Sequence, residues 1–252
     1  MHLFHAQFAV SWVEGAAYGA EHCWNAAFVV ILLIVLSLVV RGKFTDTKAA
    51  VIPNPKFGLQ NVFELVTEAA LGLMKGMMSP KDAAYFLPLI GTCAFFILFS
   101  NLLGLVPGFA PPTSLLNTTV PCAIIIFLTT HIYGVKSHGP KYILHFFGPV
   151  VPTKTTPVYA IPFILILMIL MFAIEIISHL ARPLSLSMRL MGNMFADHTV
   201  VVIFTVLVPF LPVLVPVPVM LLGVFVCVVQ SLVFCLLSII YISTAIEHAE
   251  EH

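Results

Sequence analysis

The feature that most constrains the fold of this chain is a series of apolar runs, each long enough to cross a lipid bilayer. Crossing about 30 Å of hydrocarbon takes roughly 20 apolar residues in a helix. Such runs occupy residues 24–40, 83–106 and 115–135, and a longer apolar block covers 158–246. The chain is 60% hydrophobic and only 9% charged, which excludes an ordinary soluble domain. The sequence therefore predicts an all-α, polytopic membrane protein.

The long apolar block is interrupted by prolines. Four of them fall within ten residues, which one continuous helix cannot accommodate: Pro209, Pro212, Pro216 and Pro218. The block therefore divides into two long helices, 158–208 and 219–246, and about five transmembrane passages result within one membrane-integral domain. Before the second passage, apolar residues recur at helical spacing, which indicates an interfacial amphipathic helix: Val62, Leu65, Val66, Ala69 and Leu73.

The loop charges predict the orientation. Nine of the eleven Lys and Arg residues lie in the connections 41–82 and 136–157. Cytoplasmic loops of membrane proteins are enriched in these cations, so both connections are expected in the cytoplasm, with 1–23 an outer tail and 247–252 a cytoplasmic tail. No basic n-region or transit peptide precedes the first passage, which favours a retained span and a bacterial plasma (inner) membrane.

The fourth passage contains a charged residue that would be energetically costly to expose to lipid. Arg189 lies in its middle, and a permanently charged guanidinium inside a membrane usually has a functional partner or a water-filled cavity. Glu175, Arg182 and Arg189 are seven residues apart, so they drift by only about 40° over roughly 21 Å of helix and share one face. Asn193 extends this face by one turn. The face must therefore meet protein or water.

Purely structural roles remain open for several of these residues. Arg182 could extend its guanidinium toward a lipid headgroup, and Glu175 could simply neutralise it. Asn193 could serve only to join helices. His198 lies about 180° around the helix from Arg189 and faces a different neighbour, either as a proton relay or as a packing histidine. Arg189 resists such an explanation, because no acidic residue lies within one turn on its own face.

The run Leu-Ser-Leu-Ser-Met-Arg-Leu-Met-Gly-Asn-Met-Phe-Ala-Asp-His at 184–198 resembles the signature of subunit a of the F-type ATP synthases. In that family this subunit is the membrane stator that faces the rotating c-ring. The similarity extends to further positions along the chain: Pro53–Pro55, Asn101–Pro107, Glu175, Arg182–Pro183, Gln230 and Ile240–Ser243. The resemblance implies five passages, with two long, tilted helices lying against the ring.

The resemblance also implies a proton-translocating role in which this chain performs no covalent chemistry itself. Arg189 would favour the ionised c-ring carboxylate and block leakage between two offset half-channels, since Arg does not deprotonate in proteins. Asn193, His198 and Gln230 match positions of the outer half-channel, and Glu175 matches one nearer the cytoplasmic exit. Arg182, Asp197 and His179 are further candidates. The implied partners are the c-ring, the peripheral-stalk b subunits, the catalytic head through that stalk, and the lipid bilayer.

One position departs from the family pattern. Many relatives have an ionisable residue seven positions before the Gln, where this chain has Gly223. That leaves His198 without its usual partner and makes Asp197 a candidate substitute.

Other function classes receive less support. An independent ion-coupled secondary transporter is the alternative, although such proteins usually contain internal repeats and none is evident here. No cofactor or nucleic acid is expected, because phosphate-binding loops and basic stripes are missing from the sequence. No metal is expected either, since nothing follows the His248–His252 pattern to complete a zinc site.

Overall fold

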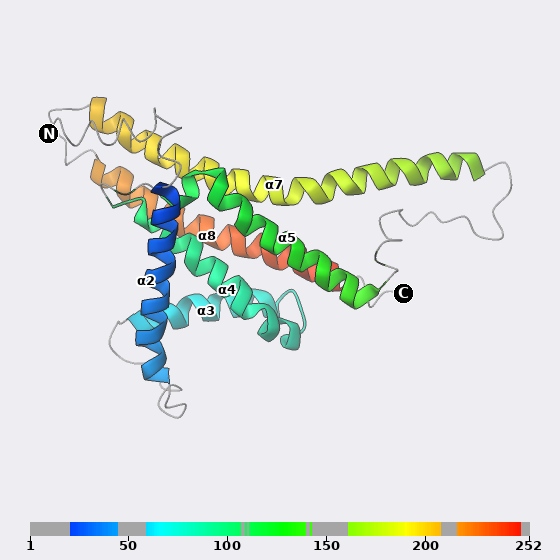
Figure 1. Ribbon diagram of the computed structural model, residues 1–252, viewed down its shortest axis with the longest axis horizontal. Coiled ribbons are helices and arrows are strands. Elements are labelled where there is room, and N and C mark those ends of the chain that lie inside the picture. The colour runs from blue at the N-terminus through cyan, green and yellow to red at the C-terminus, as the bar shows by residue number, and fades with distance from the viewer. Residues whose placement is uncertain are drawn as a thin grey trace.

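The computed structural model describes residues 21–44, 59–106, 109, 111–139, 142, 161–207 and 216–247. Most of the predicted outer tail, much of both Lys-rich connections, the first two prolines of the cluster and residues 248–252 lie outside these ranges. Within the described ranges, the regular elements are all helical (Figure 1).

The helices follow one another along the chain as α2 (Glu21–Phe44), α3 (Leu59–Lys75), α4 (Pro80–Leu103), the short 3-10 helix η1 (Pro112–Ser114), α5 (Leu116–His138), α7 (Ile161–Leu207) and α8 (Pro216–Glu247). Five of the described helices are long and apolar enough to cross a membrane, and they contain the candidate spans His22–Val40, Pro80–Leu103, Leu116–Ser137, Pro162–Asp197 and Met220–Ile246. The predicted all-α, polytopic fold is therefore confirmed.

Local sequence explains where two of these helices begin. α4 begins three residues before the apolar run, because the Ser79 hydroxyl accepts a hydrogen bond from the Asp82 backbone N–H at 3.3 Å and Pro80 occupies the first turn. α8 begins at Pro216, a position where proline costs no helical hydrogen bond. Pro183 lies inside α7, and the helix continues through it.

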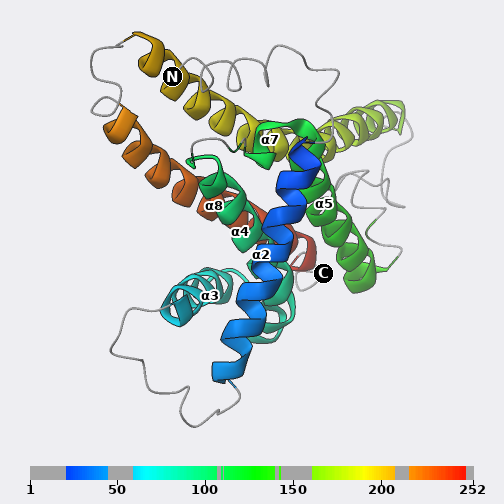
Figure 2. The same ribbon diagram turned by 60° about the vertical axis from the view of Figure 1, so that its left-hand side comes forward.

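The helices pack around two apolar clusters. One joins α3, α4 and α8 through Met74, Phe86, Ile90, Ile239 and Ile242. The other joins α4, α5, α7 and α8 through Ile97, Ile126, Leu186, Leu190 and Phe234. The middle of α7 is therefore held by three helices, whereas its N-terminal part projects beyond the bundle (Figures 1 and 2).

The amphipathic helix α3 has a protein-facing side that the apolar pattern did not identify. Ala70 and Met74 are buried against the bundle, whereas Leu65 of the predicted apolar face is 67% exposed. Ala69 is exposed as well. Leu73 of the predicted face packs against the buried cluster, whereas Leu65 and Ala69 stay exposed, so tertiary packing covers only part of that face.

Candidate functional site

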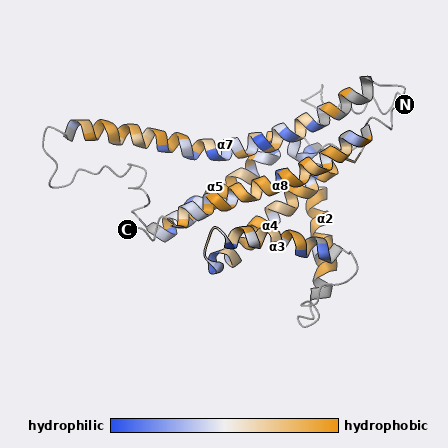
Figure 3. Ribbon diagram, turned by 180° about the vertical axis from the view of Figure 1, so that it is seen from behind, coloured by the Kyte–Doolittle hydropathy of each residue, from blue (hydrophilic) through white to orange (hydrophobic). Residues whose placement is uncertain are grey.

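The middle of α7 presents one apolar and one polar side. Leu186, Leu190 and Met194 are buried at helical spacing, and they fix this part of α7 on its neighbours. Arg189 and Asn193 lie on an exposed side of the same turns. Figure 3 shows hydrophilic residues interrupting the otherwise hydrophobic helix in this region. Packing of the apolar side therefore leaves the Arg189 side uncovered by the part of the chain that the structure describes.

Asn193 and Gln230 join the two longest helices. The Asn193 Nδ2 group donates a hydrogen bond to Gln230 Oε1 on α8 at 2.6 Å. Gln230 is only 3% exposed, so this bond satisfies a side chain that lipid could not solvate. Two residues that the family resemblance is expected to place in one half-channel are thus in direct contact, one helical turn from Arg189.

Two serine hydroxyls bond α8 to its neighbours. Ser231, directly after Gln230, donates from its hydroxyl to the Ala94 carbonyl of α4 at 2.9 Å. Ser243 donates to the Met77 carbonyl after α3. Ser243 falls in the Ile240–Ser243 run that resembles the family, whereas Ser231 had no such signal beyond being a polar residue in an apolar helix. Both bonds restrict sliding of α8 and so position Gln230.

Asp197 and Gly223 face each other across the α7–α8 interface. A Cβ atom added to Gly223 would lie 2.8 Å from Asp197 Oδ2, 3.3 Å from Asp197 Oδ1 and 2.7 Å from Leu105 Cδ2. The Asp197 carboxylate therefore occupies the space beside Gly223, the position at which the family resemblance implies an ionisable residue. The backbone of His198 belongs to α7, and its side chain lies outside the described residues.

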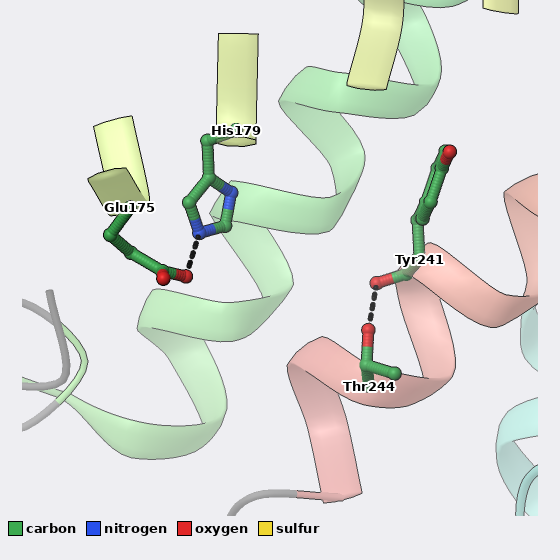
Figure 4. Close-up of polar contacts among 4 residues, drawn as sticks. All are labelled: Glu175, His179, Tyr241 and Thr244. Atoms are coloured by element: carbon green, nitrogen blue, oxygen red, sulfur yellow. Dashed lines mark hydrogen bonds and ion pairs between the residues drawn. The ribbon is translucent and has the colours of Figure 1, made fainter. Parts of the chain in front are cut away.

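A second polar cluster lies toward the N-terminal end of α7. His179 Nε2 is 3.1 Å from Glu175 Oε1, one turn earlier on the helix (Figure 4). The His179 ring also lies 5.0 Å, centre to centre, from the ring of His131 on α5. Arg182 lies over the Tyr241 ring of α8 at 5.5 Å. Among the described residues, Glu175 pairs with His179 and forms no ion pair with Arg182.

His131 was not among the residues predicted from the sequence. A single histidine near the end of the third passage carries no motif, and only its proximity to the α7 candidates reveals it. The structure thus gathers the candidates into two groups. Asn193, Asp197 and Gln230 lie beyond Arg189 along the chain or on the facing helix, and Glu175, His179 and Arg182 precede it.

Comparison with known proteins gives this arrangement a family context. Residues 24–243 match the family model described as ATP synthase A chain. ATP synthase subunit a 2 of Syntrophotalea carbinolica is 46% identical over 217 residues, which is 86% of this chain and 84% of that protein. ATP synthase subunit a of Geobacter sulfurreducens is 44% identical over 237 residues, or 94% and 90% of the two chains. With most of its length matched in this way, the chain belongs to the ATP synthase A chain family.

Proposed function

We propose that this protein is the proton-conducting stator subunit of an F-type ATP synthase, with two offset half-channels separated by Arg189. The observation that carries the proposal is the placement of this guanidinium. It lies mid-helix on the side of α7 that the described helices leave uncovered, and no described carboxylate forms an ion pair with it. A cation at membrane depth needs a partner, and a c-ring carboxylate passing this side would supply one.

The proposed role of Arg189 is electrostatic. A fixed guanidinium favours the ionised form of an approaching carboxylic acid, so the ring releases its proton there. Because Arg remains protonated in proteins, it also repels a proton that would otherwise cross directly between the half-channels. Each charge that moves through 100 mV contributes about 2.3 kcal/mol, which rotation of the ring would transmit as torque.

The two polar groups on either side of Arg189 suit the two half-channels. Asn193 and Gln230, together with His198, would form the outer one, and Glu175 would belong to the cytoplasmic one. Family membership favours this function over an independent transporter. The positive loops support a cytoplasmic position for the N-terminal end of α7, in a bacterial plasma membrane. The c-ring, the b subunits of the peripheral stalk and, through them, the catalytic head would be its partners.

Thiol labelling tests whether the two groups open to opposite sides. Residues 175 and 198 are separated by a rise of about 35 Å along α7. In a Cys23→Ser background, we expect a membrane-impermeant thiol reagent to modify Glu175→Cys from the cytoplasmic side and His198→Cys from the outer side. Leu184→Cys is the control, because Leu184 is 61% exposed on α7 and would face lipid or the ring. Modification of both test positions from one side would contradict the arrangement.

We further propose that Asp197 is the carboxylate of the outer half-channel and assists His198. Asp197→Asn should slow proton uptake and shift its pH dependence toward lower pH, because removing a nearby negative charge destabilises the imidazolium. Proton uptake is measured in vesicles over a range of outer pH values. An unchanged pH profile in Asp197→Asn would show that the carboxylate does not act on His198.

A further inference from the structure

The junction of α5, α7 and α8 holds titratable side chains in addition to Glu175. His131 and His179 lie there on two different helices, and both line a partly open pocket together with Arg182 and Tyr241. The space inside is about that of one water molecule. We infer that His131 and His179 act with Glu175 as a proton relay in the half-channel on the N-terminal side of Arg189. This inference rests on the proposed function.

The hydrogen bonds orient the His131 ring for proton transfer. His131 Nδ1 lies 2.9 Å from the Phe127 carbonyl oxygen, which can only accept. Nδ1 therefore carries the hydrogen in the neutral ring, and Nε2 keeps the lone pair that can receive a proton. With the two ring centres 5.0 Å apart, a water in the pocket could link His131 to His179.

His179 connects the pocket to the carboxylate. Its Nε2 atom is 3.1 Å from Glu175 Oε1, a distance at which an imidazolium N–H donates to a carboxylate. Along α7, His179 precedes Arg189 by about 15 Å of rise, and Glu175 lies about 6 Å further. His179 and Glu175 thus lie in the order in which a proton released from the ring beside Arg189 would meet them on its way toward the N-terminal end of α7.

The charged groups around the two histidines favour transfer of the proton to Glu175 and disfavour a histidine that stays protonated. Arg182, near both rings in the pocket, repels a resident imidazolium, whereas the Glu175 carboxylate attracts the proton in the opposite direction. Tyr142 packs near His131, with ring centres 6.1 Å apart, and burial raises the pKa of its hydroxyl, so it remains neutral. Tyr241 supplies a ring face to Arg182.

The proton balance of the relay is closed. A c-ring carboxylic acid loses its proton beside Arg189 and becomes a carboxylate. The proton adds to the lone-pair nitrogen of a neutral imidazole, and the resulting imidazolium transfers an N–H proton to Glu175. The protonated Glu175 then releases it to water. Only bonds to hydrogen change: His131 gains and loses its proton at Nε2, whereas His179 gains one at Nδ1 and loses one at Nε2, so its starting tautomer returns by proton exchange with water in the pocket.

The test compares His131→Gln, His179→Gln and the double variant in the assembled ATP synthase in vesicles. We expect each single change to slow ATP-driven proton pumping by roughly tenfold or more, since general acid–base groups typically contribute about a hundredfold or more. Because the groups act in series, the double variant should pump no more slowly than the slower single variant.

Two comparisons separate a relay from packing. Thr129→Val is the control on α5, because the Thr129 hydroxyl bonds only its own helix, at the Ile125 carbonyl, and does not line the pocket. In His131→Ala, added imidazole should restore pumping, which it would not do for a packing defect. Wild-type pumping in the double variant, no rescue by imidazole, or an equal loss in Thr129→Val would overturn the relay.

Arg189→Ala in the same assay distinguishes failure of the histidine relay from failure of the proposed function. If that variant loses pumping while the histidine variants pump normally, the relay is wrong and the proposed function stands. If Arg189→Ala pumps normally, the proposed function itself fails.

Discussion

Replacing Arg189 with Ala is expected to abolish ATP-driven proton pumping and ATP synthesis, with a loss of more than about a hundredfold, since no other group would both ionise the ring carboxylate and block leakage. Hydrolysis of ATP by the detached catalytic head should remain intact. The measurement is proton uptake by vesicles that carry the assembled complex, alongside ATP hydrolysis by the released head. Near-normal pumping in the Ala variant would remove the basis of the proposed function.

Two further variants show whether a permanent charge at this position is what matters. Arg189→Lys keeps a cation but should rescue poorly, because a buried Lys can lose its proton whereas Arg does not. Arg182→Ala should have a smaller effect than Arg189→Ala, since Arg182 lies over the Tyr241 ring and away from the uncovered side of α7. Equal losses in the two Arg→Ala variants would indicate a general need for positive charge along α7.

Exchanging Asp197 and Gly223 is the second change with a large expected effect. Asp197→Gly alone should reduce proton pumping by about tenfold or more, because it removes the carboxylate beside His198. Adding Gly223→Asp should restore much of the activity. The space beside Gly223 is where the Asp197 carboxylate now lies, within 2.8 Å of an added Cβ, so the same charge would return from α8. Both variants are assayed by ATP-driven proton pumping and by passive proton flux in vesicles.

Gly223→Asp in the presence of Asp197 is the matched control. It places two carboxylates in one gap, where their like charges repel, whereas the 2.7 Å approach of the new Cβ to Leu105 Cδ2 is common to this variant and the exchanged pair. We therefore expect this single variant to pump more slowly than the exchanged pair. If the exchange restores nothing while both variants assemble, the position of the carboxylate on α7 is itself required.

The sequence alone predicted the features that depend on local composition and spacing. Three apolar runs and a long apolar block divided by prolines are enough to predict five helical passages. Apart from a closed β-barrel, only a helix satisfies its backbone hydrogen bonds within lipid. The seven-residue spacing of Glu175, Arg182 and Arg189 predicted one polar side of α7, whereas in the structure Arg182 lies over the Tyr241 ring of α8 and Arg189 is exposed. The run around Arg189 also identified the family that the comparisons show.

Only the tertiary structure decided which candidates meet. The contacts of Asn193 with Gln230, of Asp197 with Gly223 and of His179 with His131 each join residues far apart in the chain. Such pairings depend on the depth and rotation at which whole helices pack, which apolar side chains such as Leu190 and Phe234 set together with the Ser231 bond to α4. A local sequence pattern does not specify how deep a helix lies beside its neighbours. His131 was therefore not predicted from the sequence, and it became a candidate only because the packing of α5 beside α7 brings it close to His179.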